Sequence, residues 1–219
     1  MACPSITLKI ASSLDGKIAL ENGQSKWITG EEARLDGRRL RAVHDAIAIG
    51  VNTAIEDNPK LTTRIEGALD PVRIIFDSRA RLPLGSNLVQ TAEQTPTYVI
   101  TANDSENSRA LAEQGVIILF AGATSQGYVD INIAMDMLGH HGIKTLLIEG
   151  GGTLAASFIK AGLVDVIEWY RAPIIMGGDG RNAIGDLGLE AMTFVHKFNR
   201  IEFKEMGADI YERYERVRD

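Results

Sequence analysis

Short apolar runs and amphipathic segments alternate along the chain. Most of the apolar runs are continuous, which is typical of strands that are covered on both faces. They predict strands at Ser5–Ser12, Asp45–Gly50, Val72–Asp77, Thr97–Thr101, Val116–Phe120, Lys144–Ile148 and Val164–Tyr170. The segments between them predict helices at Glu31–Val43, Ser105–Gln114, Val129–His140 and Leu154–Lys160. Strands that alternate with helices in this way predict an α/β fold with a mixed, mostly parallel sheet.

The end of the chain has a different pattern. Two β-prone segments, Arg200–Met206 and Asp209–Tyr214, flank the dipeptide Gly207-Ala208, which is the signal of an antiparallel hairpin. No internal repeat or long linker interrupts the order of the elements, and the chain has 219 residues. We therefore expect one domain over residues 1–219, with the hairpin as its last part.

Composition and charge narrow the function. The chain carries 23 basic and 29 acidic residues, a net charge of −6, and has no basic run or stripe. Nucleic-acid binding therefore has little support, and an anionic ligand must be bound by a few placed cations. No apolar run approaches the length of a membrane span, and the N-terminus has no leader-like segment, so we expect a cytoplasmic protein.

Disulfides and metal sites have equally little support. Cys3 is the single cysteine, so no disulfide can form within the chain and no metal site can be built on cysteines. The histidines are His44, His140, His141 and His196, and their spacing matches no metal-binding motif. We expect no metal.

The most specific local signal is the segment Leu146–Ala156, with the sequence LLIEGGGTLAA. Three glycines between a predicted strand and a predicted helix leave backbone N–H groups bare at the helix N-terminus, where an anion such as a phosphate is favoured. Two alternatives stay open. A tight turn without a ligand needs fewer glycines than these. A Rossmann fingerprint, with Glu168 as its ribose-binding acid, would normally follow the first strand of its nucleotide-binding half, whereas several strands precede this one.

Two further groups of residues lie near the first predicted helix. Trp27 stands in a polar loop and could cover a cofactor ring, or it could anchor that loop in the core. Arg34, Arg38 and Arg41 share one helix face, which is by default a solvated basic face. Arg41 is the better candidate for a ligand contact, because it lies at the helix end next to the strand that begins at Asp45.

Polar side chains also follow two of the predicted strands. Asp57 and Arg64 follow the strand Asp45–Gly50, and Ser78 follows the strand Val72–Asp77. Open α/β sheets bind ligands at the carboxyl ends of their strands, and Arg64 could bind a phosphate through two hydrogen bonds. The alternative is an Asp-Asn-Pro turn that has no function.

Taken in order, these motifs resemble a known family. The segments SLDGKIA, SKWIT, LRA, DAIAIGVNTAIEDNPKLTTR, PVRIIFDS, IEGGGTL, GLVD and APIIMGG are similar to those of the pyrimidine reductase of riboflavin biosynthesis, 5-amino-6-(5-phosphoribosylamino)uracil reductase. The similarity extends from about Thr7 to the C-terminal hairpin. It implies a dihydrofolate-reductase-like, three-layer α/β fold, NADPH as cofactor and, as in the archaeal-type enzymes, a homodimer. Many bacterial members are fused behind a zinc-dependent deaminase, and no deaminase domain is expected here.

The resemblance also implies roles for individual positions. The positions that match the family's substrate contacts are Ser25, Arg41, Leu61, Arg64 and Glu149, and those that match its NADPH contacts are Ala11, Trp27, Thr53, Asp57, Ser78 and the run Gly151, Gly152, Thr153, Leu154 through Ser157. Ser25, Arg41 and Arg64 would bind the ribose phosphate, and Glu149 would bind the sugar or the pyrimidine. Asn58 stands where many members have a second aspartate.

The implied reaction is hydride transfer from nicotinamide C4 to ribose C1′, which converts the ribosyl group to ribityl. Asp57 is the first candidate for an acid near the reacting carbon, and Glu149 is the second. The nearer alternative is a pterin reductase on the same fold, which would reduce dihydrofolate or dihydromethanopterin. A phosphate-binding set of Ser25, Arg41 and Arg64 favours the pyrimidine as substrate over the dihydropterin. The further alternative is a nucleotide-binding module without catalysis.

Overall fold

The structure is a computed structural model that describes residues 3–218, and the chain divides into two compact units. Unit 1 consists of residues 39–147 together with the start of the chain up to Ser5, and unit 2 consists of residues 6–38 and 148 onward. The division passes through helix α1 (Glu31–Ala42) and strand β7 (Thr145–Glu149), which contribute residues to both units. Every helix in the described part of the chain is too short or too polar to cross a lipid bilayer.

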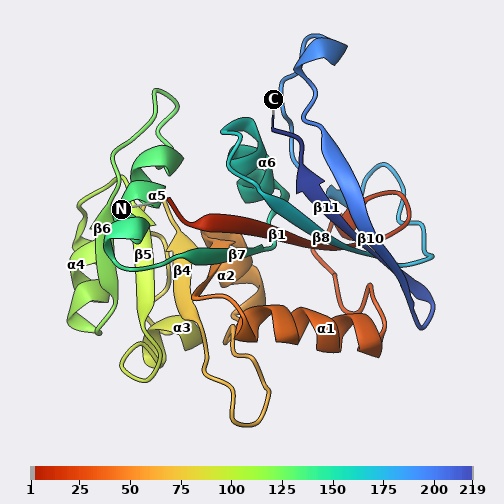
Figure 1. The fold of residues 1–219 in the computed structure, drawn as a ribbon. Helices are drawn as coiled ribbons and strands as arrows, with labels where there is room; N and C mark the ends of the chain where they lie inside the picture. Colours follow the sequence, from red (N-terminus) through yellow and green to blue (C-terminus); the bar gives the residue numbers. More distant parts are fainter. Residues whose placement is uncertain (1–2, 219) are drawn as a thin grey trace. The chain divides into compact units, whose positions relative to one another are not determined.

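Unit 1 contains a parallel sheet. Its strands stand in the order β3 (Ala46–Gly50), β4 (Val72–Phe76), β5 (Thr97–Thr101) and β6 (Ile117–Phe120). Ile49, Ile75, Val99 and Ile118 are register partners from strand to strand, so one row of β-branched side chains crosses the sheet. Figure 1 shows β4, β5 and β6 side by side, in colours from yellow to green.

Both faces of this sheet are buried. The helices of unit 1 are α2 (Val51–Asp57), α3 (Asn87–Gln90), α4 (Glu106–Glu113) and α5 (Ile131–His140). Ile49 and Ile75 pack in one core cluster with residues of α2, α3 and α4. Alternate residues of the same sheet, such as Ile74 and Ile100, point to the other face and are also fully buried. Two covered faces explain why the strands are continuous apolar runs in the sequence.

Unit 2 contains a mixed set of strands. β1 (Ser5–Ser12) pairs in parallel with β8 (Val166–Arg171), β8 pairs antiparallel with β11 (Asp209–Arg216), and β11 pairs antiparallel with β10 (Phe198–Met206). α6 (Gly152–Lys160) and the first part of α1 lie on opposite sides of these strands (Figure 1). Shorter elements are the antiparallel ladder of β2 (Lys17–Ala19) with β9 (Arg181–Asn182) and the 3-10 turn η1 (Met192–Phe194).

The predicted fold class is confirmed, since the strands are mostly parallel and an antiparallel hairpin of β10 and β11 ends the chain. Ser5–Ser12 and Thr97–Thr101 have the predicted bounds, and the other predicted elements differ by one or two residues at an end, where helices and strands fray. The pattern does not predict α2 or α3. Both are short, and neither has a side-chain hydrogen bond at its N-cap.

Candidate functional site

The glycine turn joins β7 to α6 and belongs, from Ile148 onward, to unit 2. Gly150 and Gly151 have φ angles of 85° and 84°, a region that residues with a side chain rarely adopt. Gly152 is required for a different reason, because an added Cβ would lie 2.3 Å from the carbonyl oxygen of Asn182. Backbone geometry therefore accounts for each of the three glycines.

The same turn leaves hydrogen-bond donors at the N-terminus of α6. Gly151 is the N-cap and provides no side-chain hydrogen bond, and Ala155 is the residue whose N–H donates to the Gly151 carbonyl, at 3.0 Å. The N–H groups that precede Ala155 in the helix have no carbonyl partner within it. Together with the helix dipole they favour an anion. Glu149, half-buried at the end of β7, is the carboxylate beside this turn.

A glycine-rich strap, residues 174–185, packs on the glycine turn. The Gly185 N–H donates to the Gly152 carbonyl at 2.8 Å, and the Asn182 carbonyl occupies the space where Gly152 has no side chain. Lys17 on β2 donates from Nζ to the side chain of Asn182 at 2.6 Å. The position of the strap therefore fixes one side of the turn that offers the donors.

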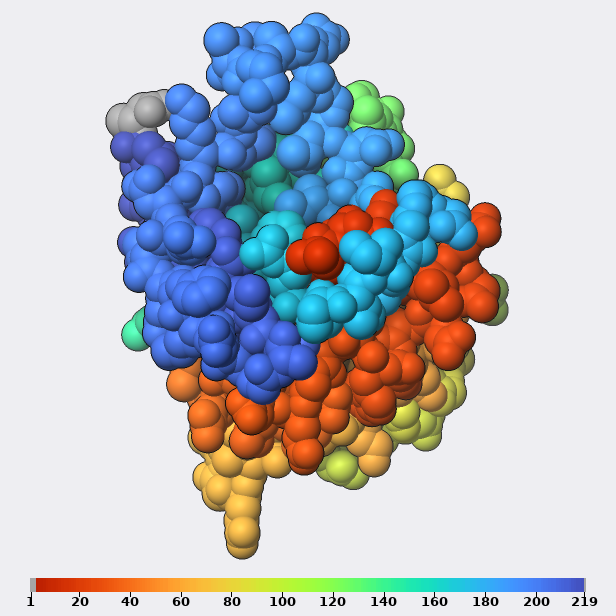
Figure 2. Space-filling view, turned by 90° about the vertical axis from the view of Figure 1, so that its right-hand side faces the viewer, coloured from red at the N-terminus to blue at the C-terminus, as the bar shows by residue number. Residues whose placement is uncertain are grey.

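Asp15 fastens the strap from the loop that follows β1. Its carboxylate accepts hydrogen bonds from the N–H groups of Met176 and Gly177, at 3.1 and 2.8 Å, and from the Ser13 hydroxyl at 2.5 Å. The bond from Ser13, supported by the two N–H groups, lowers the pKa of Asp15 to about 2. Figure 2 shows atoms of the loop after β1 in red, flanked by the cyan and light blue atoms of the strap.

Trp27 lies in the loop before α1 and is exposed over 67% of its surface. The guanidinium carbon of Arg34 stands 4.6 Å from its ring centroid, and the same guanidinium donates to the Thr29 carbonyl at 2.6 Å. The alternative that Trp27 anchors this loop in the core is therefore wrong, and Arg34 holds the loop instead of lying on a solvated basic face. Ser25 in the same loop and Ala11 on β1 are half-buried.

In unit 1, three of the predicted substrate residues meet in the loop that follows α2. Leu61 and Arg64 have φ angles of 56° and 53°, a left-handed conformation that costs a residue with a side chain about 1–2 kcal/mol. Arg41 holds the backbone between them, since its guanidinium donates to the Thr62 carbonyl at 2.9 Å. Leu61 is buried in the core cluster, whereas Arg64 is exposed.

Two further contacts hold this loop. The Asp70 carboxylate accepts from the Thr63 N–H at 2.7 Å and from the Thr63 hydroxyl at 3.1 Å. The Asn58 side chain accepts from the Asn87 N–H at 2.7 Å, and the Asn87 side chain donates to the Asn58 carbonyl at 2.7 Å. Asn58 has a φ of 41°, which asparagine tolerates better than most residues. Its clamp to the start of α3 accounts for asparagine at this position.

Thr53 and Asp57 lie four residues apart on α2 and therefore on one side of that helix. Asp57 is the last residue of the helix and is exposed, so a ligand can reach its carboxylate, and Thr53 is half-buried. Ser78 follows β4, and its hydroxyl oxygen accepts from the Val129 N–H at 2.9 Å. These positions lie beyond the carboxyl ends of β3 and β4, where ligands bind in open α/β sheets.

Glu168 decides the Rossmann alternative. It lies on β8 and is 2% exposed; the Tyr211 hydroxyl donates to its carboxylate at 2.5 Å and Arg213 forms an ion pair with it at 3.1 Å. Burial raises the pKa of this carboxyl, with the Tyr211 bond acting in the opposite direction. A carboxylate enclosed within the sheet cannot bind a ribose, so the Rossmann assignment is wrong.

The two units thus carry different parts of the predicted site. Unit 2 holds Ala11, Ser25, Trp27, Glu149, Gly151, Gly152, Thr153 and Leu154, and unit 1 holds Arg41, Thr53, Asp57, Leu61, Arg64 and Ser78. Within residues 3–218, no group of three or more histidine, cysteine, aspartate or glutamate side chains is placed to hold a metal. The supporting residues Asp15, Asp70 and Asn87 were missed by sequence reasoning, and only Asp15 lies within a quoted motif, SLDGKIA.

These features define a dihydrofolate-reductase-like α/β protein with a glycine-built helix N-terminus and polar loops after its parallel strands. The model of the RibD C-terminal domain family matches residues 4–211, which is nearly the whole chain. The chain belongs to this family.

Named relatives agree with this assignment. The chain is 37% identical over 213 residues to a riboflavin biosynthesis protein RibD of Actinobacillus pleuropneumoniae, covering 96% of this chain and 56% of that protein. It is 34% identical over 217 residues to a 2,5-diamino-6-ribosylamino-4(3H)-pyrimidinone 5′-phosphate reductase of Methanothermobacter thermautotrophicus, covering 96% of this chain and 97% of that protein. A solved structure of Acinetobacter baumannii RibD superimposes with a TM-score of 0.84 at 31% identity, over 99% of this chain and 59% of that one. The chain therefore spans little more than half the length of its RibD relatives.

Proposed function

We propose that this chain is an oxidoreductase of riboflavin biosynthesis, which uses NADPH to reduce the ribosyl group of a 5-amino-6-(5-phosphoribosylamino)pyrimidine to the ribityl form. The observation that carries the proposal is the glycine turn, in a chain that matches the Methanothermobacter thermautotrophicus reductase over nearly the full length of both. Uncapped N–H groups at the start of α6 are donors that fit the pyrophosphate of a dinucleotide.

Bound NADPH would supply a hydride from nicotinamide C4 to ribose C1′. The chain's own contribution is to bind and orient both molecules. Gly151, Gly152, Thr153 and Leu154 would hold the pyrophosphate, and Ala11, Trp27, Thr53, Asp57 and Ser78 would hold the rest of the cofactor. The exposed ring of Trp27, braced by Arg34, fits the role of a flat surface against a cofactor ring or ribose.

On the substrate side, Ser25, Arg41 and Arg64 would bind the ribose phosphate, Leu61 would contact the substrate, and Glu149 would bind the sugar or the pyrimidine. The strained backbone at Leu61 and Arg64 supports this role, because strain of this kind gathers at binding sites. Asp57 would donate or hold a proton at the carbon that is reduced, with Glu149 as the second candidate.

The proposal includes a cytoplasmic homodimer. Its physical support is β10, which pairs with β11 on one side and carries Ile201 and Phe203, 49% and 51% exposed. An edge strand with exposed apolar side chains is a common surface for a second copy of the same chain.

The test is loss of NADPH absorbance with two classes of substrate. The purified chain is offered the phosphoribosylaminopyrimidine, in its deaminated and its amino form, and separately dihydrofolate and dihydromethanopterin. We expect oxidation of NADPH with at least one of the pyrimidines. Oxidation with a dihydropterin alone would make the chain a pterin reductase, and binding of NADPH without any oxidation would leave a nucleotide-binding module.

The proton assignment has its own test. Asp57→Asn should lower the turnover rate with the pyrimidine by on the order of 10²–10⁴-fold, the contribution typical of a general acid. Binding of NADPH should stay within a few-fold of the original. A wild-type rate in this variant would remove Asp57 from the catalytic step and leave Glu149 to be tested in the same way.

A further inference from the structure

Within unit 2, the loop that carries Trp27 is tied to the last hairpin of the chain. Gly30 is the N-cap of α1, because its carbonyl accepts from the Arg34 N–H at 3.2 Å. The Gly30 N–H donates to the carboxylate of Asp209, the first residue of β11, at 2.6 Å. The two residues are 179 positions apart in the sequence, and Figure 1 shows the start of α1 beside the hairpin of β10 and β11.

Asp209 supplies an acceptor that the sequence of α1 does not provide. In a common motif at helix N-termini, the side chain of the third helical residue accepts from the N–H of the N-cap. The third residue of α1 is Ala33, which has no acceptor, and Gly30 has no side chain with which to cap the helix. A carboxylate is also favourable beside the positive end of a helix. Asp209 is 4% exposed, so its charge-assisted hydrogen bond to Gly30 is largely shielded from water.

Two glycines allow the hairpin and the helix to approach each other. A Cβ added at Gly30 would lie 3.4 Å from Oδ2 of Asp209, so a larger residue would have little room there. Gly207 forms the turn of the hairpin with a φ of 63°, and a Cβ added to it would lie 3.8 Å from the carboxylate of Glu32 in α1. The hairpin turn therefore lies against the first turn of α1 as well as being bonded to its N-cap.

The first turn of α1 in turn holds Trp27. The Arg34 guanidinium donates to the Thr29 carbonyl at 2.6 Å and stands 4.6 Å from the centroid of the Trp27 ring. Because most of the Trp27 surface is exposed, this cation has a large share in fixing the direction of the ring. Arg34 can do so only while the first turn of α1 keeps its place, and Asp209 fixes that place from β11.

We propose that Asp209 is a positioning residue for the cofactor. It holds the first turn of α1 so that Arg34 keeps the Trp27 ring in the orientation that receives NADPH. The inference rests on the proposed function, which assigns Trp27 to the cofactor. It adds a residue of the C-terminal hairpin, distant in sequence from every predicted contact, on which the affinity for NADPH depends.

The test follows Trp27 directly, by fluorine NMR of protein labelled with 5-fluorotryptophan. The chain has two tryptophans, Trp27 and Trp169, so two signals are expected, and Trp27→Phe assigns them. Trp169 lies on β8 and pairs with β11, so its signal is an internal control for the sheet. In Asp209→Ala the Trp27 signal should move and narrow toward that of an unconstrained side chain, while the Trp169 signal stays in place.

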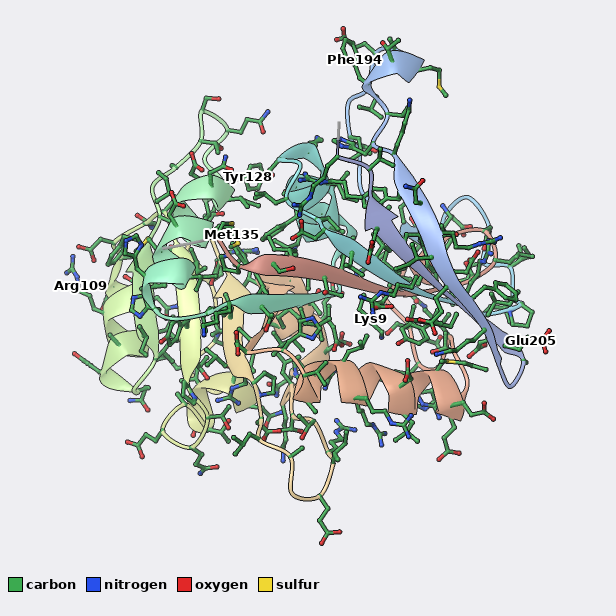
Figure 3. All side chains as sticks on the ribbon, in the orientation of Figure 1. Lys9, Arg109, Tyr128, Met135, Phe194 and Glu205 are labelled. Carbon is green, nitrogen blue, oxygen red and sulfur yellow. The ribbon has the colours of Figure 1, made fainter. Side chains whose placement is uncertain are left out.

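Binding and turnover are measured on the same variant. Asp209→Ala should bind NADPH roughly 3- to 10-fold more weakly by calorimetry, the order of one charge-assisted hydrogen bond that acts through other residues. The KM for NADPH should rise to match, while kcat at saturating NADPH stays within a few-fold, because the reacting atoms are not touched. Glu205→Ala is the matched control. Glu205 is an exposed carboxylate on β10 near the tip of the same hairpin (Figure 3), and its removal should change neither the Trp27 signal nor NADPH binding.

A second substitution separates the positioning of Trp27 from the stability of α1. Gly30 has no left-handed φ and serine is a favoured N-cap, so Gly30→Ser in the Asp209→Ala background gives α1 a cap of its own. This double variant should regain the urea midpoint lost in Asp209→Ala, but neither the Trp27 signal nor the affinity for NADPH. Recovery of all three would reduce Asp209 to a helix cap and overturn the proposal. If Asp209→Ala alone does not fold, the double variant takes its place and is compared with Gly30→Ser.

The outcome is separate from that of the proposed function. A protein in which Asp209→Ala releases the Trp27 ring and weakens NADPH binding, but which reduces no pyrimidine, would uphold the positioning role and refute the reaction. A protein that reduces the pyrimidine, with the same Trp27 signal and the same affinity for NADPH in Asp209→Ala, would uphold the reaction and refute the positioning role.

Discussion

The glycine turn of unit 2 and the loop after α2 in unit 1 solve the same backbone problem in two ways. Both need residues with positive φ, but the turn uses Gly150 and Gly151, whereas the loop uses Asn58, Leu61 and Arg64. Glycine adopts this conformation without steric cost. The loop must instead be held in a costly conformation by contacts from elsewhere in unit 1.

The difference is in what each region can offer a ligand. The glycine turn exposes backbone donors and no side chains, which fits a group such as a pyrophosphate. The loop keeps its side chains and fixes their direction, with Arg41 bound to Thr62 and Asp70 bound to Thr63. Strain is therefore accepted where particular side chains must be presented, and glycine is used where only the backbone is needed.

Gly152→Ala should have the largest effect of any single substitution in these two regions. The new methyl group would stand 2.3 Å from the Asn182 carbonyl, and backbone cannot move aside as a flexible side chain can. We expect a loss of about 3 kcal/mol in the free energy of unfolding, the upper end of the usual cost of overpacking, and weaker NADPH binding. Urea unfolding and a binding titration measure the two effects.

Gly178→Ala is the control for this change. Gly178 lies in the strap, has no left-handed φ, and a Cβ there would meet no atom within 4 Å. It should unfold at the same urea concentration as the original protein. If Gly152→Ala did so as well, the close packing of the strap on the glycine turn would not exist in solution.

Asn58→Ala tests the loop after α2 and should lower the free energy of unfolding somewhat less than Gly152→Ala does. Alanine loses the hydrogen bond from the Asn87 N–H and must keep a φ of 41°, so we expect a loss of about 1–2 kcal/mol. Asn58→Gly loses the hydrogen bond alone and should cost about 0.5–1 kcal/mol. Equal stability of the two variants would mean that the left-handed backbone is not under strain.

The same contrast explains how far sequence reasoning reaches. The strands were predictable because burial on both faces requires a continuous apolar run. The glycine turn was predictable because three consecutive glycines between a predicted strand and a predicted helix are a local sequence signal. The clamp from Asn58 to Asn87 was not, because its partners lie 29 residues apart and each is an ordinary loop residue by itself. α2 was missed because Gly50, its N-cap, provides no side-chain signal.

Asp77→Asn should have a smaller effect that depends on pH. Asp77 is fully buried at the end of β4, and burial raises its pKa above the ordinary value of 3.8. The hydrogen bond from the Leu82 N–H opposes this shift only in part. The folded protein therefore binds this proton more tightly than the unfolded chain does. Between pH 3.8 and the raised pKa, stability should fall as pH increases, because the folded state holds more protons.

Asparagine at position 77 has no such proton and should remove this part of the slope while it still accepts from the Leu82 N–H. Urea unfolding of the two proteins is compared at a series of pH values from about 4 upward, because the proton of Asp77 is lost above its ordinary pKa. Parallel curves would mean that the Asp77 carboxyl is not desolvated. If the stability of the original protein instead rose with pH relative to that of Asp77→Asn, the pKa of Asp77 would be lowered and not raised.

Asp15→Asn should have the smallest effect, confined to the strap. The weaker acceptor should loosen the N–H groups of Met176 and Gly177, so that their hydrogen exchange becomes faster while global unfolding is unchanged. In the original protein the pKa of Asp15 is lowered to about 2. Its contribution to the local stability of the strap is therefore present above pH 3.8 and is lost as pH falls toward 2. Asp186→Asn, an exposed aspartate just beyond the strap, is the control and should leave both exchange rates as they are. If Asp15→Asn also left them as they are, the strap would be held on the glycine turn without Asp15, by the packing of Asn182 against Gly152 and the hydrogen bond from the Gly185 N–H.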